Sequence, residues 1–114
     1  MDALNYSTSE INTHQKWIDG KDIYRKVVDL GNLPNTTTKE VIAGLTNVDT
    51  VIKLDTMSFD TLGYMSLPYV VLSSDNGFNI SVGYTLATDK IWIRTGTNRS
   101  AWTGFAILEY TKTS

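Results

Sequence analysis

The chain has 114 residues, enough for one domain whose hydrophobic core needs neither a disulfide nor a metal to stabilise it. Its net charge is −2 and its ten Lys and Arg residues are scattered, which argues against nucleic acid as a partner, because phosphate neutralisation supplies most of the affinity of such complexes. The sequence has no cysteine, which excludes a disulfide framework, and no apolar run near the roughly 20 residues that span a bilayer, so no membrane partner is expected.

The N-terminal stretch, residues 1–15, is polar, rich in Ser, Thr and Asn, and without apolar periodicity. We interpret it as a linker or an extended arm, followed by a single domain over residues 16–114. The stretch also lacks the basic start and apolar middle of a secretory signal.

The segment KWIDGKDIYRK, residues 16–26, either holds an acidic loop that grips a ligand or forms a hairpin. Asp-Gly between two strand-like runs is among the strongest short-range hairpin signals, because a tight type I′ turn needs positive φ at both central residues. We therefore predict a type I′ turn at Asp19 and Gly20, with Lys21 and Asp22 solvated at its tip. The acidic ligand loop is kept as the alternative.

Alternation of apolar and polar residues predicts strands through the rest of the chain, since successive side chains of a strand point to opposite faces. The clearest runs are VDTVIKLDT (48–56), FNISVGYTLA (78–87), KIWIRT (90–95) and AWTGFAILEYTK (101–112). TTTKEVIAGLTN (36–47) competes as a helix, but its Thr run and Val-Ile pair favour a strand. Breaks containing Gly, Asn, Asp or Pro separate the runs, so we predict an all-β, antiparallel, jelly-roll-like β-sandwich of about seven strands.

The predicted core follows the apolar face of each run. In the run 48–56, strict alternation places Val48, Ile52 and Leu54 on one face and Val51 on the other. The residues expected in the core are Val27, Val41, Ile52, Leu54, Val70, Ile80, Val82, Ile91, Ile93 and Leu108.

Few residues in this sequence are candidates for catalysis. The only histidine, His14, lies in the predicted arm, away from any expected cleft. Twelve acidic residues leave a glycosidase-type carboxylate pair open, but most of them stand in turns, where Asp is favoured by local hydrogen bonds. There is no His pair and no Gly-rich phosphate loop before a helix, although Asp75 in SSDNG leaves a weak calcium site open. We expect no enzymatic activity, no catalytic residue, no cofactor and no resident metal.

Aromatic residues point to binding, because sugars stack their C–H faces on aromatic rings while their hydroxyls bond to polar side chains. In KIWIRT, Trp92 and Arg94 alternate with Ile91 and Ile93, so an inward pair of isoleucines directs Trp92 and Arg94 outward. Such an outward indole is an apolar surface that a ligand or a subunit can cover. The alternative is a tryptophan buried between sheets or between subunits.

Two further groups of side chains are candidates for ligand contacts. The polar loop TGTNRS contains Asn98 and Arg99, and Arg99 is suited to a carboxylate or a sugar acid; the alternative is a solvated turn. Tyr64 and Tyr69 flank the sequence MSLP and either line a groove or pack over a sheet edge.

Several phrases in this order and spacing resemble a domain found at the C-terminal end of tail-fibre and other virion-surface proteins of phages and prophages of Gram-positive bacteria. They are YSTSE, WIDGKDIYRK, LGNLPNTTTKEV, TGTNRS and LEYTKTS, which together span residues 6–114. Where relatives often have His-Gly after the TTTK strand, this chain has Ala43-Gly44. The resemblance therefore lends no support to histidine chemistry.

The resemblance implies a fibre-tip module on the virion surface that adheres to host wall polysaccharide or teichoic acid without an enzymatic step. It also implies a homotrimer, with the N-terminal arm running in from a shaft and contacting other virion proteins. The alternative is a structural trimerising or capping domain of a tail or head fibre that binds no receptor of its own.

Overall fold

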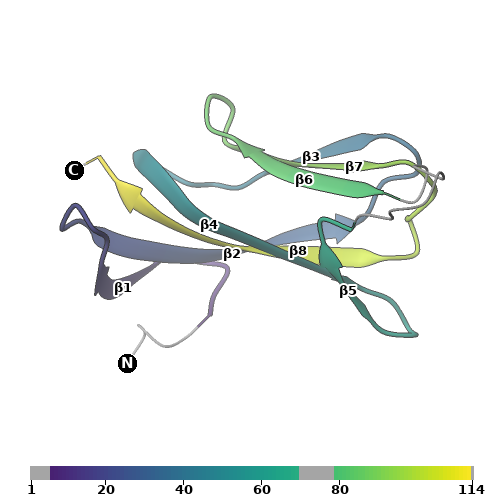
Figure 1. Cartoon of the computed structure of the whole chain (residues 1–114), viewed down its shortest axis with the longest axis horizontal. Helices are drawn as coiled ribbons and strands as arrows, with labels where there is room; N and C mark the ends of the chain where they lie inside the picture. The colour runs from purple at the N-terminus through teal and green to yellow at the C-terminus, as the bar shows by residue number, and fades with distance from the viewer. Residues whose placement is uncertain (1–5, 70–78, 114) are drawn as a thin grey trace.

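The computed structural model describes residues 6–69 and 79–113 of the chain. Within them, eight strands form two antiparallel sheets packed face to face, and Figure 1 shows the smaller sheet as a separate layer over the larger one. The larger sheet has the order β1-β2-β8-β4-β5, with bounds Ile11–Lys16, Asp22–Asn32, Thr103–Lys112, Val48–Phe59 and Tyr64–Leu67. The smaller sheet has the order β3-β7-β6, with bounds Thr38–Ile42, Lys90–Thr95 and Ile80–Thr85. The predicted all-β antiparallel sandwich is confirmed.

The strand pairs are nested in sequence and alternate between the sheets. β2 pairs with β8 in the larger sheet, while β3, the next strand, pairs with β7, the strand before β8, in the smaller sheet. Nesting of this kind fits the jelly-roll-like arrangement that the sequence predicts. Among the described residues, no helix is long and apolar enough to cross a membrane.

The core lies between the inner faces of the two sheets. Ile91 and Ile93 of β7 and Leu108 and Tyr110 of β8 each have an exposed fraction of 0%. Up to Tyr110, their alternation with more exposed neighbours is the two-residue period expected of strands with one buried face.

Most residues predicted for the core occupy it. Those that are buried or pack against it are Ile80, Ile91, Ile93, Leu108, Val41, Leu54 and Val82. Val27 lies instead on the outer face of the larger sheet, opposite Ile107 of β8, whose neighbours Ala106 and Leu108 point inward. Val70 lies outside the described residues.

Strand β4 departs from strict alternation. Its register with β8 shifts between Val48 and Val51 and again between Val51 and Lys53. These β-bulges turn Val51 toward the core and leave Ile52 outside the core cluster. The predicted alternation is therefore wrong at Val51 and Ile52, because an inserted residue moves the side chains that follow it to the other face.

The larger sheet begins within the stretch that the sequence analysis assigned to the arm. β1 pairs with β2, and the buried Thr13 donates its hydroxyl to the carbonyl oxygen of Ile23 at 2.6 Å. Further upstream, the amide of Val27 donates to the carbonyl oxygen of Ser7 at 2.8 Å. Hydrogen bonds thus tie the chain to the sheet from Ser7 onward, in a stretch whose sequence has no apolar periodicity.

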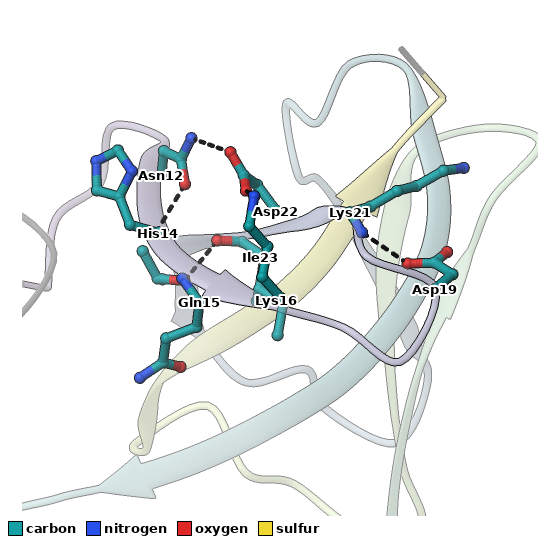
Figure 2. Close-up of polar contacts among 9 residues, drawn as sticks. Asn12, His14, Gln15, Lys16, Asp19, Lys21, Asp22 and Ile23 are labelled. Atoms are coloured by element: carbon teal, nitrogen blue, oxygen red, sulfur yellow. Dashed lines mark hydrogen bonds and ion pairs between the residues drawn. The ribbon is translucent and has the colours of Figure 1, made fainter.

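A hairpin joins β1 to β2 at Asp19-Gly20, as predicted, but its turn is not type I′. The amide of Gly20 donates to the carbonyl oxygen of Trp17 at 2.9 Å, and Gly20 has a φ of 85° while Asp19 has no positive φ. This is a three-residue loop in which a left-handed glycine forms a bulge after the turn. The Asp19 carboxylate favours it by accepting a hydrogen bond from the amide of Lys21 at 3.0 Å (Figure 2).

The two isoleucines Ile93 and Ile42 of the smaller sheet provide a matched test of this core, since their exposed fractions are 0% and 69%. We expect Ile93→Ala to lower the free energy of unfolding by about 2–5 kcal/mol, because it leaves a cavity between the sheets. Ile42→Ala should change it by less than about 0.5 kcal/mol. Urea unfolding of the two variants measures both values, and equal losses would contradict the assignment of the inner face.

Candidate functional site

The outer face of the smaller sheet carries the aromatic residue that the sequence singled out. Because Ile91 and Ile93 are buried, Trp92 and Arg94 of β7 point to the opposite side of the sheet. The strand register places their neighbours, so we define the Trp92 face as Thr38, Glu40, Ile42, Ser81, Gly83, Thr85, Lys90, Trp92 and Arg94.

Trp92 packs against the neighbouring strand at Gly83. The two residues are direct cross-strand partners, and a Cβ placed on Gly83 would lie within 2.7 Å of the Trp92 Nε1. Only a residue without a side chain therefore lets the indole rest on the β6 backbone. Trp92 stays partly exposed, so it is not buried between the sheets.

Charged and hydroxyl groups surround the indole. Glu40 of β3 lies opposite Trp92, and Arg94 lies two positions further along β7, between Thr38 and Ser81. These four side chains are all exposed. The Trp92 face thus combines an apolar platform with hydrogen-bond donors and acceptors on a surface that the second sheet does not cover.

A second group of candidates lies at the end of the sandwich, where Figure 1 shows the β2–β3 and β7–β8 loops side by side. The guanidinium of Arg99 lies 5.7 Å from the centroid of the Tyr69 ring, and the amide of Arg99 donates to the carbonyl oxygen of Pro34 at 3.2 Å. The side-chain oxygen of Asn98 accepts from both the amide and the hydroxyl of Ser100, at 3.0 and 2.7 Å. Arg99 and Tyr69 therefore lie close together, whereas the side chain of Asn98 stabilises the turn of the β7–β8 loop.

Tyr64 lies apart from both groups. It is 77% exposed at the start of β5 in the larger sheet, and its ring is 5.7 Å from that of Phe59, its cross-strand partner. Tyr69 instead pairs with Ile80 next to the smaller sheet, at the opposite end of β5 from Tyr64. The six candidates thus fall at three places on the surface.

A pocket at the β1–β2 hairpin was not predicted from the sequence. Its volume is roughly 250 Å³, and its lining residues are Lys16, Lys21, Asp22, Tyr24 and Lys112. We call it the lysine pocket. Figure 2 shows Asp22 turned toward Asn12, which donates to it at 2.9 Å, and the Lys21 side chain extending away from both.

Ion pairs fix the groups around the lysine pocket. Hydrogen bonds from Lys16 and Asn12 hold the pKa of the Asp22 carboxyl below its usual value. The hydrogen bond to Asp49 raises the pKa of the Lys21 ammonium, and the two groups are 2.6 Å apart. Lys21 and Asp22 are therefore engaged with neighbouring side chains, where the sequence predicted simple solvation.

A third carboxylate, that of Glu10, forms an ion pair with Lys112 of the lysine pocket. Glu10 lies 2.8 Å from the ammonium of Lys112 and also accepts a hydrogen bond from the hydroxyl of Tyr110. Burial, with that hydrogen bond, raises the pKa of the Tyr110 hydroxyl well above its usual value. No local sequence signal links these groups, because Lys112 and Lys16 lie near opposite ends of the chain.

The placement of the described His, Asp and Glu side chains does not support a metal site. In residues 6–69 and 79–113, no group of three His, Cys, Asp or Glu side chains is placed to hold a metal ion. Asp75, which left a calcium site open in the sequence, lies outside these residues.

Comparison with known proteins leaves the family open. No family model, curated protein or solved structure matches the chain. The resemblance to virion-surface proteins therefore stays a prediction from the sequence.

The packing of Trp92 on Gly83 gives a direct test. We expect Gly83→Ala to displace the indole, because the added methyl occupies the space of the ring, and to shift the Trp92 indole N–H signal in ¹H–¹⁵N spectra. Gly63→Ala is the matched control, since a Cβ there meets nothing within 4 Å. An unshifted Trp92 signal in Gly83→Ala would contradict the observed packing.

Proposed function

We propose that this chain is a non-enzymatic module that adheres to carbohydrate on a host cell surface through the Trp92 face. The observation that carries the proposal is the indole of Trp92, which packs against Gly83 and has the exposed polar side chains of the Trp92 face around it. A ring fixed in this way loses little conformational entropy when a ligand stacks on it.

The shape of the face favours a polymer over a small molecule. The Trp92 face is an open sheet surface, and it shares no residue with the lysine pocket or with the pocket formed by β4, β5 and β8. An open surface can accept an internal segment of a long glycan, whereas small ligands are usually held in clefts that bury most of their surface. Wall polysaccharide or teichoic acid of a Gram-positive host fits this geometry and agrees with the fibre resemblance.

By the fibre resemblance, we propose that the module lies at the virion surface as part of a homotrimer. Adhesion through one open face is expected to be weak, and three linked copies would raise the overall affinity through effective concentration. The N-terminal arm would then contact other virion proteins.

A structural role as a trimerising or capping domain is the second candidate, and one observation favours it. The outer face of the larger sheet carries the partly exposed apolar residues Val27, Met57, Phe105 and Ile107, which the register places side by side. An apolar patch on an outer sheet face is the kind of surface that subunits bury.

Binding to purified wall polysaccharide from Gram-positive bacteria tests adhesion. We expect Trp92→Ala to weaken binding at least about tenfold, equivalent to about 1.4 kcal/mol, because the stacking platform is lost. Leu62→Ala, at a residue 93% exposed on the β4–β5 loop, should bind as the wild type does. Arg99→Ala is the comparator for the loop group.

The outcomes of that experiment decide between the two candidate surfaces and between adhesion and a structural role. Loss of binding in Arg99→Ala but not in Trp92→Ala would move the site to the loop group. If the wild-type chain binds no wall fraction from any host tested, adhesion fails and the structural role is preferred.

Sedimentation velocity tests the assembly. We expect a trimer at micromolar concentration, and we expect Ile107→Lys to dissociate it by placing a charge in the apolar patch of the larger sheet. Ile42→Lys, on the Trp92 face, is the matched control and should leave the trimer intact. A wild-type monomer across this range would rule out trimerisation as a property of the chain itself.

A further inference from the structure

We propose that the open edge of strand β6 pairs with the β6 strand of a second copy of this chain, in an antiparallel two-fold contact. β6 is an outer strand of the smaller sheet, whose order is β3-β7-β6 (Figure 1). The contact joins two three-stranded sheets into one continuous sheet. It uses neither a glycan nor the apolar patch of the larger sheet, so it does not rest on the function proposed above.

The main-chain groups of Val82 and Tyr84 lie on the open side of β6. The main chain of Ile80 accepts from and donates to that of Tyr69, at 3.0 and 2.8 Å, on the side away from β7. Because the direction of these groups alternates along an antiparallel strand, those of Val82 and Tyr84 point the same way as those of Ile80. Among the described residues, they have no hydrogen-bond partner on that side.

β6 lacks the features that protect the other outer strands from pairing. β1 has a shift of register, β3 carries Lys39 and Glu40, and β5 has only 4 residues and is followed by a proline. The run NISVGYTLAT, residues 79–88, contains neither a charge nor a proline, and β6 pairs with β7 without a shift. An edge strand without such protection is a surface to which another strand can be added.

One register uses all of the free main-chain groups. When Val82 lies opposite Tyr84 of the second copy, the two-fold axis passes through Gly83, and each Val82–Tyr84 pair can exchange both of its hydrogen bonds. Pairing either residue with its own equivalent would set the other against Ile80, which already bonds to Tyr69, or against the β6–β7 turn. The free groups of the main chain therefore determine the register.

The same register gives compatible side-chain neighbours on both faces of the sheet. On the inner face, Val82 lies opposite Tyr84 of the second copy, and a β-branched residue beside an aromatic ring is a favourable cross-strand pair. On the outer face, the exposed residues Ser81 and Thr85 lie opposite each other, and Gly83 meets Gly83. No charge is brought against a like charge.

The ends of the free edge limit the length of the contact. The β6–β7 turn begins at Leu86, so the second copy bends away before it reaches the edge position that Tyr69 occupies beside Ile80. Leu86 of one copy then lies near Tyr69 of the other, and these side chains are 58% and 37% exposed. The contact covers part of both. An interface this small is expected to be weak and transient.

Two-fold symmetry makes the contact self-limiting. Pairing uses the same edge of both copies, so the result is a closed pair of chains and not an open-ended filament. Residues opposite each other in an antiparallel pair point to the same face, so the two Trp92 faces lie side by side on one surface. A long glycan can then contact both faces, a consequence that does rest on the proposed function.

Amide hydrogen exchange of the full chain tests the inference without any substitution. We expect the amides of Val82 and Tyr84 to exchange quickly in dilute solution and several-fold more slowly near millimolar concentration, because their hydrogen bonds form only between copies. The amides of Ser81 and Gly83 point toward β7 and should be protected at both concentrations. Protection of Val82 and Tyr84 that does not rise with chain concentration would overturn the inference.

Two matched double variants test the register. Ser81→Lys with Thr85→Lys sets lysine against lysine at two positions of the contact, whereas Ser81→Lys with Thr85→Glu sets lysine against glutamate at both. In sedimentation equilibrium at low salt, we expect the first to weaken this association about fivefold or more and the second to retain it. Both positions are exposed, so the fold should tolerate either change. Equal association of the two variants would contradict the register.

The contact is separable from the assembly and the adhesion proposed above. Ile107→Lys, in the apolar patch of the larger sheet, should abolish the trimer and keep the concentration-dependent protection of Val82 and Tyr84. Loss of that protection in Ile107→Lys would overturn the inference, because it would assign the protection to the trimer contact. Neither experiment includes a glycan, so failure of wall binding leaves the β6 contact standing.

Discussion

The burial of Ile91 and Ile93 on one side of β7 is the constraint on which the proposed glycan site depends. Both residues have an exposed fraction of 0%, so the strand cannot slip by one residue without moving them into water. The same register forces Trp92 outward and sets Gly83 beside it on β6. The register of β7 therefore determines both the core and the Trp92 face, and a shift of that register would change both.

The same reasoning explains which parts of the molecule can be predicted from the sequence. Alternation predicts the inner face of β7 and β8 correctly, because the buried residues of β7, and those of β8 up to Tyr110, keep the two-residue period. It fails in β4, because Val51 and Ile52 are both apolar and the pattern does not reveal which of them a bulge turns inward. It fails again in β1, whose buried residue Thr13 is polar and is satisfied by a hydrogen bond to Ile23.

The lysine pocket could not be predicted for a different reason. Its members come from β1, the hairpin turn, β2 and β8, and only the pairing of both ends of the chain with β2 brings them together. Each lysine alone has the appearance of an ordinary solvated side chain. A constellation of this kind carries no local pattern, whereas the Trp92 face could be inferred because its key residues lie within one strand.

The two sheets are also joined by polar contacts beside the core. Lys39 of β3 donates to the carbonyl oxygens of Leu30 and Asn32 on the larger sheet, both at 2.8 Å. At the other end of β3, Lys26 of β2 donates to the carbonyl oxygen of Gly44 at 3.1 Å, and Gly44 itself has a φ of 75°. A positive φ explains the glycine of the Ala43-Gly44 pair on backbone grounds alone. The position of the smaller sheet, and with it the Trp92 face, thus rests on β3 contacts at both ends, and none of them involves a residue that lines the lysine pocket.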